Sequence, residues 1–287
     1  MKETIRQMKL NQAKETELRA LCRQLRIDTL KAIHARQSGH AGGSLSMCEI
    51  AAVLYFAYLN IRPEEPDWPD RDRVVLCKGH AAPMLYAALA RRGFFPVEEL
   101  STLRCMDSRL QGHPCAGKTP GVDATTGPLG LGLSFALGTA LALRMGRSSA
   151  RTYAILGDGE LNEGTVWEAC MAAAKFHADN LCAIVDWNGV QLDGTSEEIM
   201  PTGDLAAKFR AFNWHAVVCD GHDVSQLYAA LAEAETVREK PAVILARTVK
   251  GKGVSFMEGK NTWHGKVIDD ESFSAAMREL EGVAQNG

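Results

Sequence analysis

The sequence lacks the features of three common protein classes. Its eight cysteines form no Cys-x-x-Cys pair and show no zinc-type spacing, which argues against a structural zinc domain. Its longest apolar run, residues 51–59, is far shorter than the roughly 18 residues that a membrane-spanning helix needs. The 32 basic residues do not exceed the 35 acidic ones, so the charge balance indicates no surface for nucleic acid.

The composition is that of an ordinary globular protein. Apolar residues make up 46% of the 287 and charged residues 23%, which is enough to bury a core without disulfides. Residues 1–7 lack the apolar core of a signal peptide, and most cysteines lie in apolar runs, as buried free thiols do. We therefore expect a soluble, cytoplasmic protein with neither a membrane nor a nucleic-acid partner.

Short apolar runs alternate with segments of helical spacing along most of the chain. This pattern indicates an α/β fold, a mostly parallel sheet with helices on both faces. No repeat or linker divides the sequence, so we expect a single domain over 1–287, with an N-terminal helical extension over about 1–60 and a core over about 70–255. The expected strands are 74–76, 153–156, 181–185, 216–219 and 242–245. The expected helices are 11–36, 46–59, 83–92, 97–103, 131–145, 165–177, 205–212, 224–237 and 270–280, and a long loop covers 109–128.

Glycine and a charged or amide residue follow each expected strand. Ligands bind beyond the carboxyl ends of strands in open parallel sheets, so these residues are candidates for one site. Asp158 ends one strand between two glycines, and Asn188 follows the next strand. A carboxylate and an amide oxygen suit a hard cation such as Mg²⁺, and glycines let backbone N–H groups approach a phosphate. The pattern predicts a metal–diphosphate site, with a helix cap as the alternative role of Asp158.

A second phosphate-binding pattern is a false match. Residues 112–119 read Gly-His-Pro-Cys-Ala-Gly-Lys-Thr, which fits the P-loop pattern letter for letter. A P-loop needs an apolar strand before it and a helix that begins at its lysine, but no strand-like run precedes Gly112 and Pro120 prevents a helix. The pattern Gly-x-Gly-x-x-Gly is also missing around Gly130 and Gly132, which argues against a NAD enzyme.

Six motifs, in order along the chain, make the sequence resemble the transketolase family. Gly-Asp-Gly at 157–159, followed by Asn188, resembles the signature of thiamine diphosphate enzymes in general. The motifs that resemble transketolase are Ser-Gly-His-Ala-Gly at 38–42, Asp-Arg with Gly-His at 72–80, Gly-His-Pro at 112–114, Thr-Thr-Gly-Pro-Leu-Gly at 125–130 and Trp-His-Gly at 263–265. The departures from the family pattern are Ala41, Leu131 and Trp187, and none of them removes an expected ligand.

The resemblance implies a thiamine diphosphate-binding fold of the PP type and a role for each matched residue. Mg²⁺ would be bound by the side chains of Asp158 and Asn188 and by the backbone carbonyl of Val190. The residues expected to contact thiamine diphosphate are His80, Gly127, Leu129, Gly157, Asp158, Gly159, Glu163, Asn188 and His264. The candidate catalytic residues are His40, His80, His113, His264 and Glu163.

Four further charged residues have two possible interpretations each. Glu163 would belong to a carboxylate network that links two cofactors, but it could instead be an acid favoured at a helix N-terminus. Glu168 has the same two interpretations. Lys250 and its neighbour Lys252 could face solvent or steer an anionic cofactor.

The resemblance covers only the N-terminal, diphosphate-binding half of a transketolase. It implies the N-terminal subunit of a split enzyme that transfers a two-carbon glycolaldehyde unit from a ketose, expected to be phosphorylated, to an aldose. A C-terminal partner would supply the pyrimidine-binding half, the glutamate that activates the cofactor and the arginines that bind substrate phosphate, in an α2β2 heterotetramer. The alternatives are the α subunit of a 2-oxo acid dehydrogenase, a relative of deoxyxylulose phosphate synthase, and a non-catalytic cofactor-binding remnant.

Overall fold

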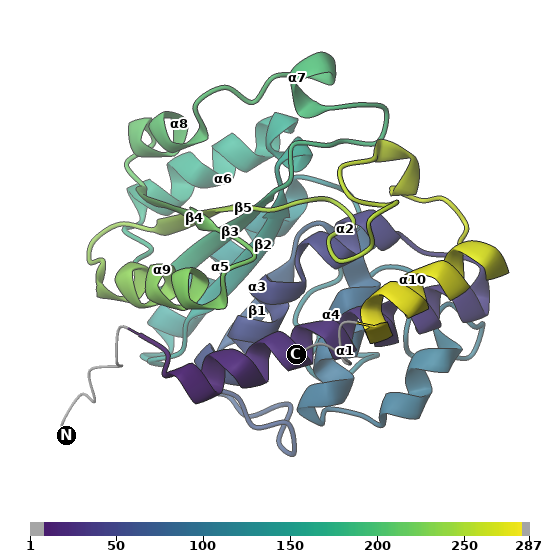
Figure 1. Cartoon of the computed structure of the whole chain (residues 1–287). Coiled ribbons are helices and arrows are strands. Elements are labelled where there is room, and N and C mark those ends of the chain that lie inside the picture. The colour runs from purple at the N-terminus through teal and green to yellow at the C-terminus, as the bar shows by residue number, and fades with distance from the viewer. Residues whose placement is uncertain (1–8, 283–287) are drawn as a thin grey trace.

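A parallel five-stranded sheet forms the centre of the protein (Figure 1). The structure is a computed structural model that describes residues 9–282. The strand order is β1-β2-β3-β5-β4, and the strands are β1 (Arg73–Leu76), β2 (Thr152–Gly157), β3 (Leu181–Trp187), β4 (His215–Asp220) and β5 (Ala242–Arg247). All neighbouring strands run in the same direction, with Ile155 opposite Ile184 in the central pair. The predicted fold class is therefore confirmed, and all five carboxyl ends meet at one edge.

Alternate residues of each strand pack into two separate hydrophobic cores. Ile155 and Ile184 face one core, whereas their chain neighbours Ala154 and Ala183 face the other. This explains why the strands are continuously apolar in sequence, because both faces of a parallel sheet are covered. Figure 1 shows helices on both sides. The first core includes α1 (Gln12–Arg36), α3 (Cys48–Val53), α4 (Ala82–Arg92) and α9 (Val224–Thr236), and the second includes α5 (Leu131–Met145), α6 (Gly164–Lys175) and α8 (Leu205–Ala211).

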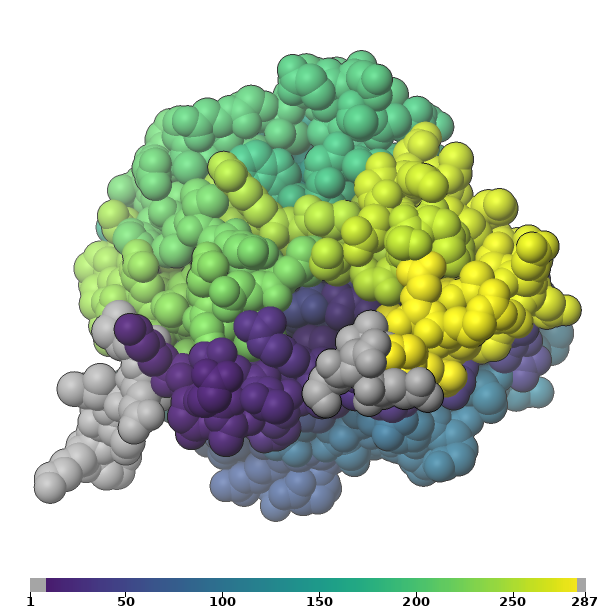
Figure 2. Space-filling model, in the orientation of Figure 1, coloured from purple at the N-terminus to yellow at the C-terminus, as the bar shows by residue number. Residues whose placement is uncertain are grey.

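The remaining elements are short, apart from the last helix. α10 (Asp270–Gly282) packs along α1, and Figure 2 shows this yellow segment on the same side of the molecule as the purple α1. No helix within residues 9–282 is long and apolar enough to cross a membrane. The short elements are α2 (Ala41–Ser46), the π-helical turn η1 (Leu54–Tyr58), α7 (Ser196–Ile199) and the 3₁₀ turns η2 (Gly79–Ala81), η3 (Val97–Thr102), η4 (Gly159–Asn162) and η5 (Asn261–Trp263).

One helix boundary differs clearly from the sequence prediction. The first helix follows the prediction: at its start the side chain of Asn11 accepts a hydrogen bond from the Lys14 N–H, and it ends at Arg36, with Gln37 (φ 50°) as the C-cap residue. The second was expected to begin at residue 46, yet the chain is helical from Ala41. Two glycines hide this turn, because glycine disfavours helices. A Cβ at Gly42 would lie 2.9 Å from the backbone oxygen of Trp263, so close packing requires glycine there.

Candidate cofactor and metal site

A cavity of about 330 Å³ lies at the carboxyl edge of the sheet. The turns after β1, β2 and β3 and the segment after β5 all contribute to its wall, as expected for a site at this edge. It brings together nine of the predicted site residues, namely His80, Leu129, Gly157, Asp158, Gly159, Glu163, Asn188, Val190 and His264. The further lining residues are Gly43, Lys78, Glu160, Asn162, Gln191, Leu192 and Lys250. The P-loop pattern at 112–119 lies in a stretch of the described chain without helix or strand, which agrees with its rejection.

Asp158 is buried at the floor of the cavity. One carboxylate oxygen, Oδ2, accepts hydrogen bonds from the Gly189 N–H at 2.7 Å and from the Ser196 hydroxyl at 3.2 Å. Burial and the nearby charge of Asp186 raise the pKa of Asp158, although these hydrogen bonds partly oppose the shift. The alternative role, a cap of the helix expected over 165–177, is wrong, because the N-cap residue of α6 is Glu163. Asp158 lies at the N-cap position of η4, but its side chain forms no cap hydrogen bond there.

The other two predicted metal ligands lie on the turn that follows β3. The side-chain oxygen of Asn188 accepts a hydrogen bond from the Val190 N–H at 3.1 Å, which fixes its direction. The carbonyl oxygen of Val190 accepts a hydrogen bond from Lys250 Nζ at 2.9 Å and so faces a positive charge. A carboxylate, an amide oxygen and a carbonyl oxygen are the donors that Mg²⁺ prefers. These residues therefore fit a hard cation.

Two buried lysines give the cavity a positive wall. Lys250 is only 2% exposed, so the solvent-facing alternative is wrong for this residue, whereas Lys252 is half-buried. Burial, followed by the charge of Lys78, lowers the pKa of Lys250 to about 8. Lys78 Nζ donates to the Gly43 carbonyl at 2.6 Å and forms an ion pair with the buried Asp186. Positive side chains at this place suit a diphosphate group.

Three of the four candidate histidines form a cluster. The ring centroids of His40, His80 and His264 lie 5.1 to 5.3 Å apart. Burial, followed by nearby cations, lowers the pKa of His40 and of His264 to about 4 and that of His80 to about 2. All three imidazoles are therefore neutral at pH 7, and each offers one donor and one acceptor.

Three predicted site residues, His40, His113 and Gly127, lie outside the residues that line the cavity. His113 is exposed, and a Cβ at Gly127 would lie 3.6 Å from the His113 ring, so these two residues are neighbours. Burial and the charge of Arg104 lower the pKa of His113. The His40 ring contacts the rings of His80 and His264, which line the cavity. The Nδ1 atom of His40 is buried without a hydrogen-bond partner within residues 9–282. Such an unpartnered polar atom is consistent with a site completed by a ligand.

The acidic side of the cavity contains one residue that the sequence did not reveal. Glu160 is buried, and its two carboxylate oxygens accept hydrogen bonds from the backbone N–H groups of Gly130 (3.0 Å) and Gly157 (3.2 Å). Burial raises the pKa of Glu160 to about 7. Glu163 is exposed at the start of α6 and lines the cavity, whereas Glu168 is exposed on the same helix and does not.

One rule could have identified three further site residues, Lys78, Asp186 and Glu160, from the sequence. Each lies at or just beyond the carboxyl end of a strand, where the sequence already placed candidate residues. What the sequence did not reveal is their burial. Hydrogen bonds from Ser46 and Thr248 satisfy Asp186 in addition to Lys78, and together these partners lower its pKa although burial alone would raise it. A buried charge with this many hydrogen-bond and ion-pair partners indicates that the fold organises this site.

Comparison with known proteins identifies the family. The family model described as transketolase, thiamine diphosphate binding domain, matches residues 17–285. The chain belongs to the transketolase family. It is 47% identical over 253 residues to the 6-deoxy-6-sulfo-D-fructose transketolase subunit SqwG of Clostridium sp. (strain MSTE9). This match covers 88% of this chain and 92% of that protein. It is 42% identical to an apulose-4-phosphate transketolase subunit of Actinobacillus succinogenes, over 85% of this chain and 88% of the relative.

Longer transketolases are matched over less than half of their length. Human transketolase is 38% identical over 97% of this chain and 44% of the human protein. The crystal structure of Campylobacter jejuni transketolase superposes with a TM-score of 0.87 at 30% identity, over 93% of this chain and 43% of that one. The predicted family and its N-terminal, thiamine diphosphate-binding half are therefore confirmed. The relatives favour transketolase over the 2-oxo acid dehydrogenase and deoxyxylulose phosphate synthase alternatives.

Proposed function

We propose that this chain is the N-terminal subunit of a split transketolase that requires Mg²⁺ and a C-terminal partner. The reaction is the transfer of a two-carbon glycolaldehyde unit from a ketose to an aldose. The observation that carries the proposal is the convergence, at one cavity, of three oxygen donors suited to a metal and a cluster of neutral histidines. Bound thiamine diphosphate supplies the chemistry that breaks and forms a carbon–carbon bond beside a carbonyl.

Residues at the floor and wall of the cavity are proposed to bind and orient the cofactor. In the proposed site, Asp158, Asn188 and the Val190 carbonyl hold Mg²⁺, which binds the diphosphate. Lys250 adds a positive charge at the same place, because its Nζ lies 2.9 Å from the Val190 oxygen. Gly159 packs closely against Gln191, since a Cβ there would lie 3.1 Å from the Gln191 side chain, and it is proposed to contact the cofactor through its backbone. The remaining residues proposed to contact thiamine diphosphate are Gly157, Leu129 and Gly127.

The histidine cluster is proposed to move protons. Over the whole transfer, each carbonyl that becomes a hydroxyl must gain a proton and each hydroxyl that becomes a carbonyl must lose one, so an imidazole could donate in one step and accept in another. His40, His80 and His264 are neutral at pH 7 without a ligand and offer hydrogen bonds to a substrate. A bound diphosphate would raise their pKa values toward the range in which an imidazole exchanges protons. His40 also has a free Nδ1 within the described chain. His113 is proposed to contact the substrate from the exposed side.

An apolar stripe on α5 supports the proposed partner and an α2β2 assembly. Leu131 and Phe135 are about half exposed, and Met145 is 85% exposed. With Ala142, these residues recur at spacings of three, four or seven and therefore lie along one side of the helix. A monomer rarely exposes such a stripe, so a partner surface is expected to cover it. Glu163 is exposed at the N-terminus of α6, which packs against α5, and it would face the same assembly.

The substrate is proposed to be a ketose with an anionic group at its far end. The two relatives described above are named for 6-deoxy-6-sulfo-D-fructose and for apulose-4-phosphate, one with a sulfonate and one with a phosphate. We also propose that residues 1–287 form one domain and that the protein resides in the cytoplasm. Its eight cysteines are all free, as is typical of a reducing compartment.

The test is reconstitution. The full chain is mixed with a candidate C-terminal transketolase subunit from the same genome, with thiamine diphosphate and Mg²⁺. Transfer from a sulfonated or a phosphorylated ketose to an aldose is followed by mass spectrometry of both products. We expect products only with both subunits, and none with Asp158→Ala. Full activity of the chain alone would contradict the split-subunit proposal, and cofactor binding without transfer would favour the non-catalytic alternative.

A further inference from the structure

The Glu49 carboxylate is buried, and it joins two side chains from distant parts of the chain. Glu49, on α3, is 7% exposed. Its oxygens lie 2.7 and 2.8 Å from Nη2 of Arg26 on α1, and one of them lies 2.9 Å from Nδ1 of His222, which follows β4. Burial alone would raise the pKa of Glu49, but Arg26 and His222 outweigh it and lower the pKa. Glu49 is therefore ionised and ties α1, α3 and the β4 turn together.

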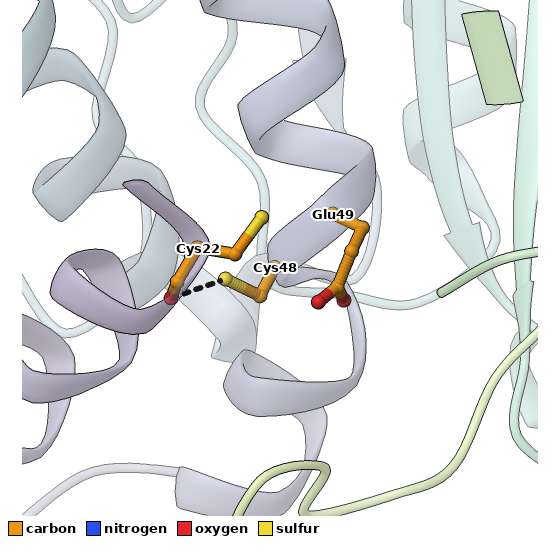
Figure 3. A group of neighbouring side chains, drawn as sticks. All are labelled: Cys22, Cys48 and Glu49. Atoms are coloured by element: carbon orange, nitrogen blue, oxygen red, sulfur yellow. Dashed lines mark hydrogen bonds between the residues drawn. The ribbon is translucent and has the colours of Figure 1, made fainter. Parts of the chain in front are cut away.

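Two thiols lie beside Glu49, so the three side chains together resemble a metal site. Figure 3 shows Cys22 and Cys48 next to the Glu49 carboxylate, with the Cys48 thiol donating to the Cys22 carbonyl oxygen. One ligand atom from each of the three residues lies within 4.8 Å of the others. The Cys48 thiol and burial raise the pKa of Cys22 well above its usual value, so without a metal this thiol stays protonated.

The protonation of His222 also argues against a metal. The Val249 N–H donates to Nε2 of His222 at 2.8 Å, so Nε2 carries no proton. The ring proton is then on Nδ1, which donates it to Glu49. No ring lone pair is left for a metal, and the Glu49 carboxylate is already bound by Arg26. The structure therefore describes an ion-pair cluster rather than a cation site.

Both partners of Glu49 also bind the backbone of one short segment. His222 accepts a hydrogen bond from the Val249 N–H, and Nε of Arg26 donates to the Lys252 carbonyl oxygen at 2.8 Å. Lys250 lies between these two anchor points. Its ammonium group reaches into the cofactor cavity, where it donates to the Val190 carbonyl and lies 3.0 Å from Nδ1 of His264.

The shape of this segment depends on its contact with Arg26. Gly251 (φ +77°) and Gly253 (φ +95°) both adopt left-handed backbone conformations. A Cβ at Gly253 would lie 2.9 Å from the Arg26 side chain, so the segment rests directly on the arginine. On the other side, the Gly251 N–H donates to the Gly42 carbonyl oxygen at 3.0 Å. A shift of Arg26 would therefore move the backbone that follows Lys250, whereas His222 holds the backbone that precedes it.

We propose that Glu49 is a positioning residue for Lys250. By holding Arg26 and His222, Glu49 fixes the backbone of 249–252, and this places the Lys250 ammonium group beside the proposed metal and diphosphate positions. The inference rests on the proposed function for the role of Lys250 in cofactor binding. The mechanical link from Glu49 to the segment rests on the hydrogen bonds alone.

The mechanical link is tested without cofactor, by hydrogen exchange of the 249–252 amides in the full chain. In Glu49→Gln we expect these amides to exchange about tenfold faster than in the wild type. The matched control is Asp28→Asn, because Asp28 is also a buried carboxylate near Arg26 on α1, but it pairs with Arg91 of α4. Unchanged exchange in Glu49→Gln, or equal acceleration in the control, would overturn the link. Should Glu49→Gln fail to fold, Arg26→Lys keeps the charge and loses the bond to Lys252.

The link to the cofactor is tested by a double-mutant cycle on thiamine diphosphate affinity, measured in Mg²⁺ on the chain with its partner subunit. Glu49→Gln is expected to weaken binding about tenfold in the wild type, as loss of a supporting partner does, and to have no further effect in Lys250→Met. Additive losses would show that Glu49 does not act through Lys250. A wild type that binds no cofactor would instead overturn the proposed function, and the exchange experiment would still test the link.

Discussion

The ammonium group of Lys250 lies 2.9 Å from the carbonyl oxygen of Val190, the atom that the sequence assigned to magnesium. A carbonyl oxygen has two lone pairs, so it can face both a lysine and a metal ion. The same ammonium group lies 3.0 Å from the Gln191 carbonyl oxygen and from Nδ1 of His264. Lys250 thus connects the proposed metal position with the histidine cluster, and its charge is available to any anion bound there.

Replacing Lys250 is expected to weaken cofactor binding. Lys250→Met keeps the length of the side chain and removes its charge and its hydrogen bonds. Since hydrogen bonds to charged groups contribute about 1.5–3 kcal/mol, the dissociation constant for thiamine diphosphate should rise roughly ten- to hundredfold. Calorimetry in Mg²⁺ measures the change. Lys252→Met is the matched control, because Lys252 is more exposed and lines other pockets, and equal losses in the two variants would contradict the assignment.

Removing the metal or its carboxylate ligand is expected to have one and the same effect. EDTA should abolish thiamine diphosphate binding by the wild type, and Mg²⁺ in excess should restore it. Asp158→Asn should bind the cofactor weakly whether or not Mg²⁺ is present, because an amide cannot replace the charge of the carboxylate. Asp193→Asn, an exposed position on the nearby turn, should behave as the wild type does. If the wild type bound thiamine diphosphate equally well with and without Mg²⁺, the assignment of the metal site would be wrong.

The depressed pKa of His80 predicts a loss of stability in acid. The unfolded chain binds a proton at His80 below pH ~6.5, whereas the folded chain, with a pKa of about 2, does not. The free energy of unfolding should therefore decrease as the pH falls below ~6.5, by up to about 1.4 kcal/mol per pH unit for this one group. Urea titrations at several pH values should show a shallower slope for His80→Gln than for the wild type.

The sheet and most of the site were predictable because they depend on local sequence patterns. Buried parallel strands are continuously apolar, and residues that follow them must meet at one edge, so the sequence alone places Asp158 and Asn188 side by side. The structure joins them through Gly189, whose N–H donates to Asp158. The resemblance named four candidate histidines, and the structure brings the rings of His40, His80 and His264 together but not that of His113.

What the sequence did not reveal depends on contacts between distant residues. Lys78 and Asp186 are separated by more than one hundred positions, and nothing local shows that they form a buried ion pair. The early start of helical structure at Ala41 was missed for a related reason. Its glycines disfavour a helix locally, but Gly43 lies so close to His80 that a Cβ would approach the ring to 3.3 Å. Tertiary packing therefore overrides the local preference.

The stripe on α5 gives a prediction about assembly. Phe135 is exposed in this chain, so Phe135→Glu should leave its fold and its unfolding midpoint nearly unchanged. If a partner covers the stripe, the new charge would be buried there without a counter-ion, and association should weaken by several kcal/mol. Sedimentation of the mixed subunits should then show separate species instead of a complex, together with lost transferase activity. Met106→Glu is the matched control, since Met106 is 95% exposed and lies outside the stripe. A complex that survives in Phe135→Glu would place the partner on another surface, and the proposed site for the C-terminal subunit would be wrong.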